Sequence, residues 1–408
     1  MTDTRLLDVQ FGLHASAADF TTTPATVSTI ELLSGHESLM PRSRESLDRE
    51  VYSIDNGRLP SLFGVKDLSA ISLGMHFRGV SGNTGGAFTP QTSMEQCRIL
   101  DSFFGAAAAA ITGAAPTVAS GSAGAVVNVS TTVLANGDMI LIPTAAGTDA
   151  REIVSGGGTL AVTVDRVLSG VPTVGGTIIR TARWNVSTAL TQHVHGYIRA
   201  EGDTYRRDYF GCLPDSLTLT CGEQKYVEMQ VSFMPNDWTD VAEANPAYVA
   251  PVAGSPIVVA DAPFWLGGVE FLVRDLKISL KHDVSARRST TGVNGITGYV
   301  ARRKHELTIS GALYLGDNAI NGVNELVDDG GTPPMGQMLG DGVSAGVAKT
   351  MIDVAVQIGT AAGAFAYIRI PAADVRGSVK DVDGYPMFVF DATATRPSTG
   401  SPFRLGVG

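Results

Sequence analysis

Two histidines, His193 and His195, stand two residues apart in this 408-residue sequence. Side chains two apart on a strand point to the same face, so the two imidazoles could share a metal ion if a third ligand, for example His76, came from elsewhere. Nothing in the spacing supplies that third ligand, and imidazoles at surfaces and interfaces are the more frequent case. We therefore interpret the pair as surface or interface residues and expect no metal and no cofactor.

The signatures of common enzymes are absent from the sequence. It contains no phosphate-binding loop, no zinc-protease helix, no nucleophile elbow and no dinucleotide-binding glycine pattern. The segment Asp381-Val382-Asp383-Gly384 begins like a calcium-binding loop, but Ala392 stands where the closing glutamate is required. We therefore expect no catalytic residues, and an enzyme is the least supported class.

A cluster of basic and aromatic residues runs from Tyr205 to Phe210, with Arg206, Arg207 and Tyr209 between them. Aromatic rings interleaved with arginine can stack bases and hold phosphates. In the alternative, the rings belong to the core of a strand and the arginines pair with acidic neighbours. We favour this second interpretation.

The strongest charge feature is the segment from residue 274 to residue 304, which carries eight Lys or Arg and two Asp in a chain of formal net charge −10. A nucleic-acid site normally belongs to a basic domain, whereas this segment belongs to an acidic chain. Contact between a basic hairpin and an acidic patch of a neighbouring copy explains the asymmetry without a third molecule. We predict that the following residues form a subunit interface: Arg287, Arg288, Arg302, Arg303 and Lys304.

The elements around this segment can be predicted from hydrophobic periodicity. Apolar and polar residues alternate over residues 276 to 281 and again over residues 306 to 315, which predicts two paired strands. The basic residues then lie at the ends of a long loop, residues 287 to 304. The sequence therefore predicts a hairpin over residues 276 to 315.

The rest of the chain has the character of a mainly β protein. Charged residues make up only 17% of the sequence and glycine is abundant, with 47 residues, a composition suited to many short strands and tight turns. Period-two patterns predict further strands, including several between residue 350 and the C-terminus. A helix is expected over residues 92 to 105, where Thr92 and Glu95 fit a capping box and Gly105 can close the helix. A second helical piece is expected near residues 317 to 328.

A segment with a different composition interrupts this pattern. Small residues dominate after residue 105, which indicates a linker. Residues 124 to 182 then form strand-like pieces, most of them separated by turn signals such as Asn136-Gly137. We predict a small β-barrel or sandwich of five or six strands inserted into a host domain.

The three cysteines, Cys97, Cys212 and Cys221, are an odd number without metal-site spacing, so we expect no disulfide scaffold. No apolar run is long enough to span a membrane, and the N-terminus lacks the order of a signal peptide. We expect a soluble protein made in a cytoplasm.

Placed in order, six segments resemble the bacteriophage tail tube protein (major tail protein) family. They are STIELLSGHESLMPRSRESLDREVYS leading to FGVKDLSAISLGMHFRG, then TSMEQCRILDSFFG, DTYRRDYFGCLPDSLTLTCGEQKYVEMQVSFMP, FLVRDLKISLKHDVSARRSTTGVNGITGYVARRKHELTISGALYL and the closing FRLGVG. The resemblance implies a β-sandwich or open barrel with a flanking helix. It assigns residues 1–105 and 187–408 to a tail-tube domain, and residues 106–186 to an inserted β module, expected on the outer surface.

The resemblance also implies a function. Homohexameric rings would stack into the tail tube that conducts DNA during genome ejection, in a virion tail assembled in the host cytoplasm. Expected partners are further copies, a tape-measure protein, a tail terminator and baseplate or tip proteins, with no membrane. The residues outside the basic segment carry a net charge of about −16, which fits an acidic lumen through which DNA slides. The alternative is a surface- or carbohydrate-binding virion protein that acts through the inserted module, although Trp184 is the only tryptophan near it.

Overall fold

The computed structural model describes most of the chain. The described residues are 6–14, 23–39, 44–47, 62–66, 69–186, 195–202, 205–222, 225–242, 250–252, 254–259, 262–288, 296–314, 351–395 and 401–408. Within them the protein is mainly β, with antiparallel sheets and only two α-helices, as predicted.

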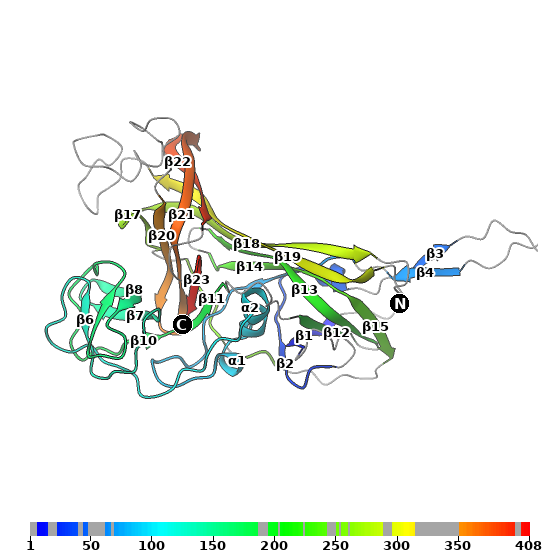
Figure 1. Cartoon of the computed structure of the whole chain (residues 1–408), viewed down its shortest axis with the longest axis horizontal. Coiled ribbons are helices and arrows are strands. Elements are labelled where there is room, and N and C mark those ends of the chain that lie inside the picture. The colour runs from blue at the N-terminus through cyan, green and yellow to red at the C-terminus, as the bar shows by residue number, and fades with distance from the viewer. Residues whose placement is uncertain are drawn as a thin grey trace, which may run out of the picture.

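One large sheet contains sixteen strands. Its path runs β17-β16-β20-β21-β22-β19-β18-β13-β12-β1-β2, and five more strands pair off this path. The strands are β1 (Leu6–Leu13), β2 (Val27–Thr29), β5 (Ile71–His76), β11 (Ala182–Asn185), β12 (Gly196–Gly202), β13 (Tyr205–Cys221), β14 (Glu228–Met234), β15 (Asp237–Ala242), β16 (Phe264–Leu266), β17 (Val269–Phe271), β18 (Val273–Arg288), β19 (Ile296–Tyr314), β20 (Ile352–Ala361), β21 (Ala364–Val382), β22 (Tyr385–Ala394) and β23 (Arg404–Val407). In Figure 1, β21 and β22 stand upright while β18 and β19 run across the view, so the sheet is strongly bent.

Strand β13 turns the corner between two parts of this sheet. Its first residues, Tyr205 to Phe210, pair with β15 and in part with β12, whereas Leu213 and the residues after it pair with β14 and β18. Gly211 has φ 60° at the corner, a value that favours glycine, and the ladder to β14 shifts register just after Pro214. Phe11 of β1 contacts Phe233 of β14, with ring centroids 5.2 Å apart. The two parts therefore share one hydrophobic core.

The predicted helix over residues 92 to 105 is interrupted. A short helix, α1 (Pro90–Ser93), is followed by α2 (Cys97–Phe104), and Gly105 closes α2 with φ 74°, as predicted. The capping box is wrong, because the side chain of Glu95 accepts a hydrogen bond from the backbone N–H of Glu31 instead of capping a helix. The carboxylate that the local pattern assigned to the helix cap is thus bound by a residue 64 positions away in the sequence.

The inserted segment forms a separate five-stranded sheet in the order β10-β7-β8-β9-β6. Its strands are β6 (Val126–Asn128), β7 (Met139–Thr144), β8 (Gly147–Ser155), β9 (Ala161–Val164) and β10 (Ile179–Arg180), and it has its own apolar core. The preceding small-residue stretch is not all linker, because Val118 pairs with Val129 and is buried in that core. Five strands agree with the predicted number.

The chain ends inside the large sheet, as the sequence predicts. Strand β23 pairs with β11 on one side and with β21 on the other. The segment resembling a calcium loop is the tight turn between β21 and β22, where Asp383 and Gly384 have φ values of 53° and 85°. The helical piece expected near residues 317 to 328 lies outside the described residues.

Two smaller elements complete the described chain. A 3-10 helix, η1 (His36–Leu39), follows β2, and β3 (Arg44–Leu47) pairs with β4 (Leu62–Lys66) in a two-stranded sheet. This hairpin lies beyond the far end of the large sheet in Figure 1.

Candidate functional site

Seven neighbouring strands of the large sheet, β5, β14, β13, β18, β19, β22 and β21, carry in-register rows of polar side chains. One row runs from Ser72 through Ser232 and Ser216 to Lys281 and Glu306. Directly paired residues of a sheet point to the same face, so each row lies on one side. We call this side the polar face; its polar and charged members are Ser72, His76, Ser216, Thr218, Thr220, Glu228, Gln230, Ser232, Asp275, Lys277, Ser279, Lys281, Glu306, Thr308, Ser310, Asp374, Arg376, Ser378, Lys380, Asp391 and Thr393.

The opposite side of the same strands belongs to the hydrophobic core. Leu217, Val231 and Ile278, which alternate with members of the polar face, are buried to 3% exposure or less. Helix α2 packs on this side, where the ring of Phe103 lies 5.4 Å from that of Phe233. The alternation of the sequence therefore produces a sheet with one buried face, part of which α2 covers, and one polar face.

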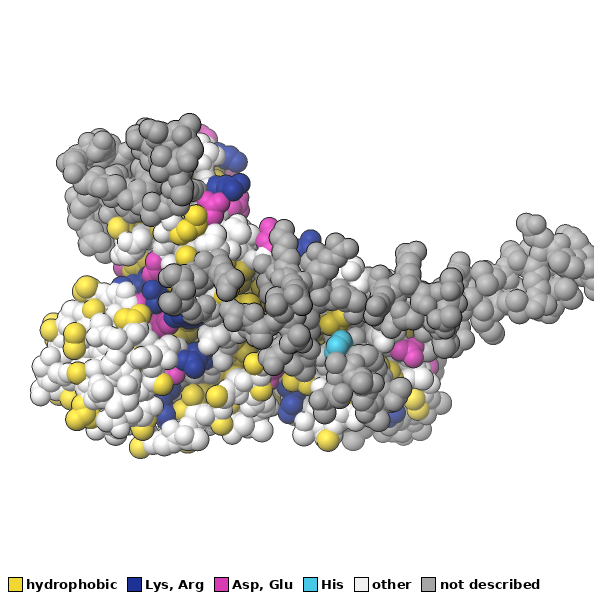
Figure 2. Space-filling model, viewed as in Figure 1, with side chains coloured by type: hydrophobic (Ala, Val, Ile, Leu, Met, Phe, Trp, Pro, Cys, Tyr) yellow, Lys and Arg dark blue, Asp and Glu magenta, His cyan; other side chains and the backbone are white. Residues whose placement is uncertain are grey.

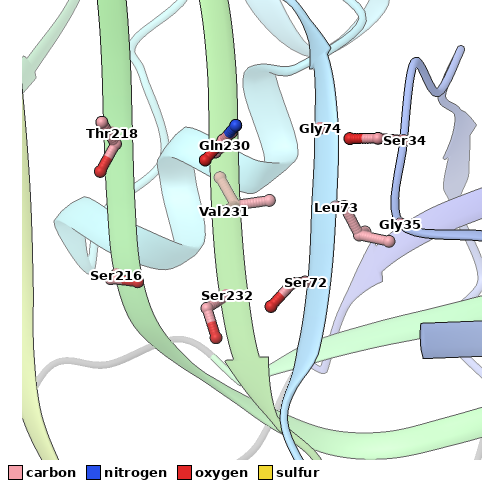
Figure 3. A pocket seen from close by; sticks show the side chains of 10 residues that line it. All are labelled: Ser34, Gly35, Ser72, Leu73, Gly74, Ser216, Thr218, Gln230, Val231 and Ser232. Atoms are coloured by element: carbon pink, nitrogen blue, oxygen red, sulfur yellow. The ribbon is translucent and has the colours of Figure 1, made fainter. Parts of the chain in front are cut away.

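The polar face holds an open hollow at its β5 edge. In Figure 3, side chains of β13, β14 and β5 line the hollow, and Ser34 and Gly35 form its wall, while α2 crosses behind the strands. The wall lies close because β5 has a glycine at residue 74, where a Cβ would come 2.3 Å from the Ser34 hydroxyl oxygen. Its lining is mostly hydroxyl and backbone, including Ser216, Thr218 and Ser232. These groups can hydrogen-bond water, but they supply no nucleophile paired with a base.

The hairpin that carries the predicted interface residues is longer than the sequence suggested. Strands β18 and β19 pair from Val273 and Leu313 out to Arg288 and Ile296. The predicted loop over residues 287 to 304 is therefore wrong, because most of it is strand. Beyond His282 the hairpin is a two-stranded ribbon within the described residues, since neither β13 nor β22 pairs with it there.

The ladder divides the predicted interface residues into two groups. Arg302 pairs with Asp283, and Arg303 and Lys304 occupy the irregular position where the register shifts. Arg287 and Arg288 lie four and five residues farther out along β18, about 13 Å or more at the usual rise of a strand. The structure therefore places the five residues along the ribbon and not around one loop.

The arginine and aromatic cluster near residue 206 is structural, as we favoured. Arg207 is fully buried, donates to the Asp240 carboxylate, and lies 4.1 Å from the ring centre of Trp238. The Arg206 guanidinium lies 3.3 Å from the carboxylate of Asp208. These side chains are committed to partners within the chain, which argues against a base-stacking site here.

A network of buried ion pairs joins the inserted sheet to the large sheet. Arg166 contacts Asp353 at 3.0 Å, and Arg369 contacts Glu152 at 2.9 Å and Asp353 at 2.9 Å. Arg404 also pairs with Glu152. Burial raises the pKa of Asp353, although Arg369 and Arg166 oppose the shift. Figure 2 shows charges of both signs gathered between the two sheets, beside a mostly uncharged inserted sheet.

Two further contacts fix the same junction. Trp265 of β16 contacts both Arg151 and Arg166 of the inserted segment, and each guanidinium carbon lies 4.9 Å from the ring centre. Gln357 of β20 accepts a bond from the Ala150 N–H and donates one to the Thr148 carbonyl. The amide of Gln357 thus pairs with the edge of β8 as a neighbouring strand would.

A second buried carboxylate lies at the start of α2. The side chain of Glu95 has no exposed surface and lies 3.0 Å from Arg78, which also pairs with Glu31. Burial raises the pKa of Glu95 to about 7, while the Glu31 N–H and the charge of Arg78 oppose that rise. This carboxylate is neutralised internally and ties three chain segments together, because Arg78 also donates to the Gly254 carbonyl.

The histidines considered as metal ligands are not gathered by the described structure. His76 packs against Tyr226, with ring centroids 5.1 Å apart, and His193 lies outside the described residues. No group of three potential ligands occurs among the residues that could be searched. In the same part of the chain, no helix combines the length and apolar character needed to span a membrane.

A sheet with one buried face, one polar face and a two-stranded ribbon suits a structural, scaffold-forming protein. Consistent with this, the family model for phage tail tube proteins matches residues 75–378, which is most of the chain. The chain belongs to the phage tail tube protein family, whose members are structural components of the virion tail. The comparison with curated proteins found no match. The resemblance inferred from the sequence is therefore confirmed.

Proposed function

We propose that the protein forms homohexameric rings that stack into a tail tube and conduct double-stranded DNA during genome ejection. The observation that carries this proposal is the continuous polar face across seven strands, which lies on the side of the sheet away from α2 (Figure 3). Joining the sheets of neighbouring copies into a closed tube would remove exposed sheet edges and give this face a common interior. The polar face then lines the lumen, and α2 with the core lies outside it.

The ribbon of β18 and β19 is proposed as the arm that joins copies. Beyond His282 it offers two open strand edges within the described residues, which a second copy can pair with or cover. The basic residues Arg287, Arg288, Arg302, Arg303 and Lys304 would meet acidic side chains of that copy. Tape-measure, terminator and baseplate or tip proteins are the proposed further partners, and assembly takes place in the host cytoplasm.

The inserted module, residues 106–186, is proposed to lie on the outer surface of the tube. It docks against β16, β20 and β21, and the charged junction described above holds it there. Residues 1–105 and 187–408 form the tail-tube domain proper in this proposal.

The first test is electron microscopy of the purified full chain, alone and with its initiator complex. Rings and tubes are expected, and a protein that forms neither under both conditions contradicts the proposal.

The second test asks which face lines the tube. The three native cysteines are buried, with 0%, 0% and 3% exposure, so Ser232→Cys places one accessible thiol on the polar face. Val171→Cys, at a position 71% exposed in the inserted segment, is the matched outer control. Assembled tubes are treated with a small biotin maleimide and then with streptavidin, which is too large for a lumen of DNA width. The control should bind streptavidin at once, and the Ser232→Cys variant only after the tubes are dissociated. Streptavidin binding to intact tubes of the Ser232→Cys variant overturns the assignment.

A further inference from the structure

We propose that the polar face passes double-stranded DNA through a balance of paired charges among short hydroxyl groups, and not through net repulsion. This inference rests on the proposed lumen and concerns how its wall treats DNA. The sequence led us to expect an acidic lumen. The described part of the polar face has a different character, because most of its uncharged members are Ser or Thr.

The charged members of the polar face are nearly equal in number and alternate in sign. The cations are Lys277, Lys281, Arg376 and Lys380, and the anions are Glu228, Asp275, Glu306, Asp374 and Asp391. The excess negative charge of the chain therefore does not lie on the described part of this face.

Three of the four cations of the polar face, Lys277, Lys281 and Arg376, have an acidic neighbour. Lys281 is directly opposite Glu306 across the ladder between β18 and β19, a position in which Cβ atoms lie about 5 Å apart. Arg376 is directly opposite Asp391 and also pairs with Asp374 at 2.9 Å.

Lys277 is separated from Asp391 only by Ser310 of the strand between them, a distance of about 10 Å at the usual strand spacing. Asp275, two residues before Lys277 on the same face of β18, is a nearer carboxylate. Lys380 differs from the other three cations, because it lies opposite Met387.

Short hydroxyl side chains occupy most of the uncharged positions of the polar face. Thr218, Ser279 and Thr308 lie in one row directly across three strands, and the hydroxyls of Thr218 and Ser279 are 3.4 Å apart. Such groups hold a layer of water but cannot reach out and grip a phosphate. A wall that neither collects cations nor repels anions leaves the hydrated duplex free to move in either direction.

The test changes the charge of the polar face in assembled full-length tubes, making it more positive in one variant and more negative in the other. Glu306→Gln with Asp391→Asn removes acids beside the lysines, and Lys277→Gln with Lys281→Gln removes the lysines. All four positions are exposed, so the fold should tolerate the changes. A short fluorescent DNA duplex and an uncharged polymer of the same radius are mixed with tubes, and their ratio in the sedimented tubes is measured at 50 and 200 mM salt.

The proposal expects opposite responses relative to wild type. Loss of the acids should enrich the duplex at 50 mM salt, and the enrichment should fall about threefold for each phosphate contact formed as salt rises to 200 mM. Loss of the lysines should exclude the duplex at 50 mM and restore it at 200 mM. If neither pair changes the ratio, or only one direction responds, the balance is not what governs passage. The streptavidin test on Ser232→Cys is independent of these outcomes, so a misassigned lumen is recognised separately.

Discussion

Glu95 is a buried carboxyl group whose protonation should affect the stability of the protein. Its carboxyl group lies beside Arg78 without exposed surface, and it receives the Glu31 N–H at 2.6 Å. Burial is the larger influence and raises the pKa of Glu95 to about 7. The folded state therefore holds a proton on this group over a pH range in which the unfolded chain has released it.

The raised pKa of Glu95 makes the stability of the protein depend on pH. The penalty for ionising Glu95 is absent below about pH 4.5 and is complete above about pH 7, so the free energy of unfolding falls as pH rises through this window. Glu95→Gln should make that fall shallower, by about 1 kcal/mol per pH unit. Urea unfolding of the unassembled protein between pH 5 and pH 8 measures the slope.

Glu31→Gln is the matched control, because Glu31 also contacts Arg78 but its side chain is 60% exposed. Its slope should stay close to that of the wild type. An unchanged slope in Glu95→Gln would show that the buried carboxyl does not control this window.

At the scale of elements, the junction of the inserted sheet with the large sheet is polar and specific. Gln357 has 1% exposure and pairs with both Ala150 and Thr148 of β8. Buried hydrogen-bonding groups that lose their partner are costly, so this junction fixes the position of the module more narrowly than an apolar contact would.

Gln357→Leu keeps the approximate volume of the side chain and leaves the Ala150 N–H and the Thr148 carbonyl without this partner. We expect a loss of about 3 kcal/mol in unfolding free energy, together with faster hydrogen exchange at the Ala150 amide. Thr148→Val is the control, because it removes only the more exposed bond from Thr148 to the Thr360 carbonyl and should cost under about 1 kcal/mol. Equal losses in the two variants would contradict the role given to Gln357.

Local sequence patterns did not predict the full length of strands β18 and β19. Alternation predicted the inner strands, but the glycines and polar residues between residues 287 and 304 indicated a loop. Pairing with the partner strand holds this stretch extended, and β-favouring residues such as Tyr299 and Val300 take part in the ladder. Helix α2 shows the same limit, because Glu95 was assigned to a cap and instead binds the distant Glu31.

For the whole molecule, the proposed contact between copies rests on the contrast between a basic ribbon and an acidic chain. Complementary charge between identical subunits sets register and orientation. The structure distributes the basic residues along a projecting ribbon, which increases the length over which a second copy can be contacted.

Reversing Arg287, Arg288, Arg302 and Arg303 to Glu should therefore block formation of rings or tubes while the monomer stays folded. Circular dichroism and thermal unfolding report the fold, and sedimentation with electron microscopy reports assembly. Arg376→Glu is a control at a surface cation of the polar face, with an 80% exposed side chain, and should still assemble. Normal tubes from the fourfold variant would remove charge pairing as the basis of the contact.

The sequence by itself determined the mainly β class, the strands at residues 71 to 76 and 228 to 234, and a strand-rich segment between residues 124 and 182. These depend on period-two patterning and composition, which are local properties of the chain, whereas the tail tube family was inferred from the resemblance of whole segments. Tertiary structure decided which rows of Ser and Thr share one face, because strand register is a long-range property. It also decided the length of the ribbon and the buried ion pairs at the junction, since those require residues about 200 positions apart to meet.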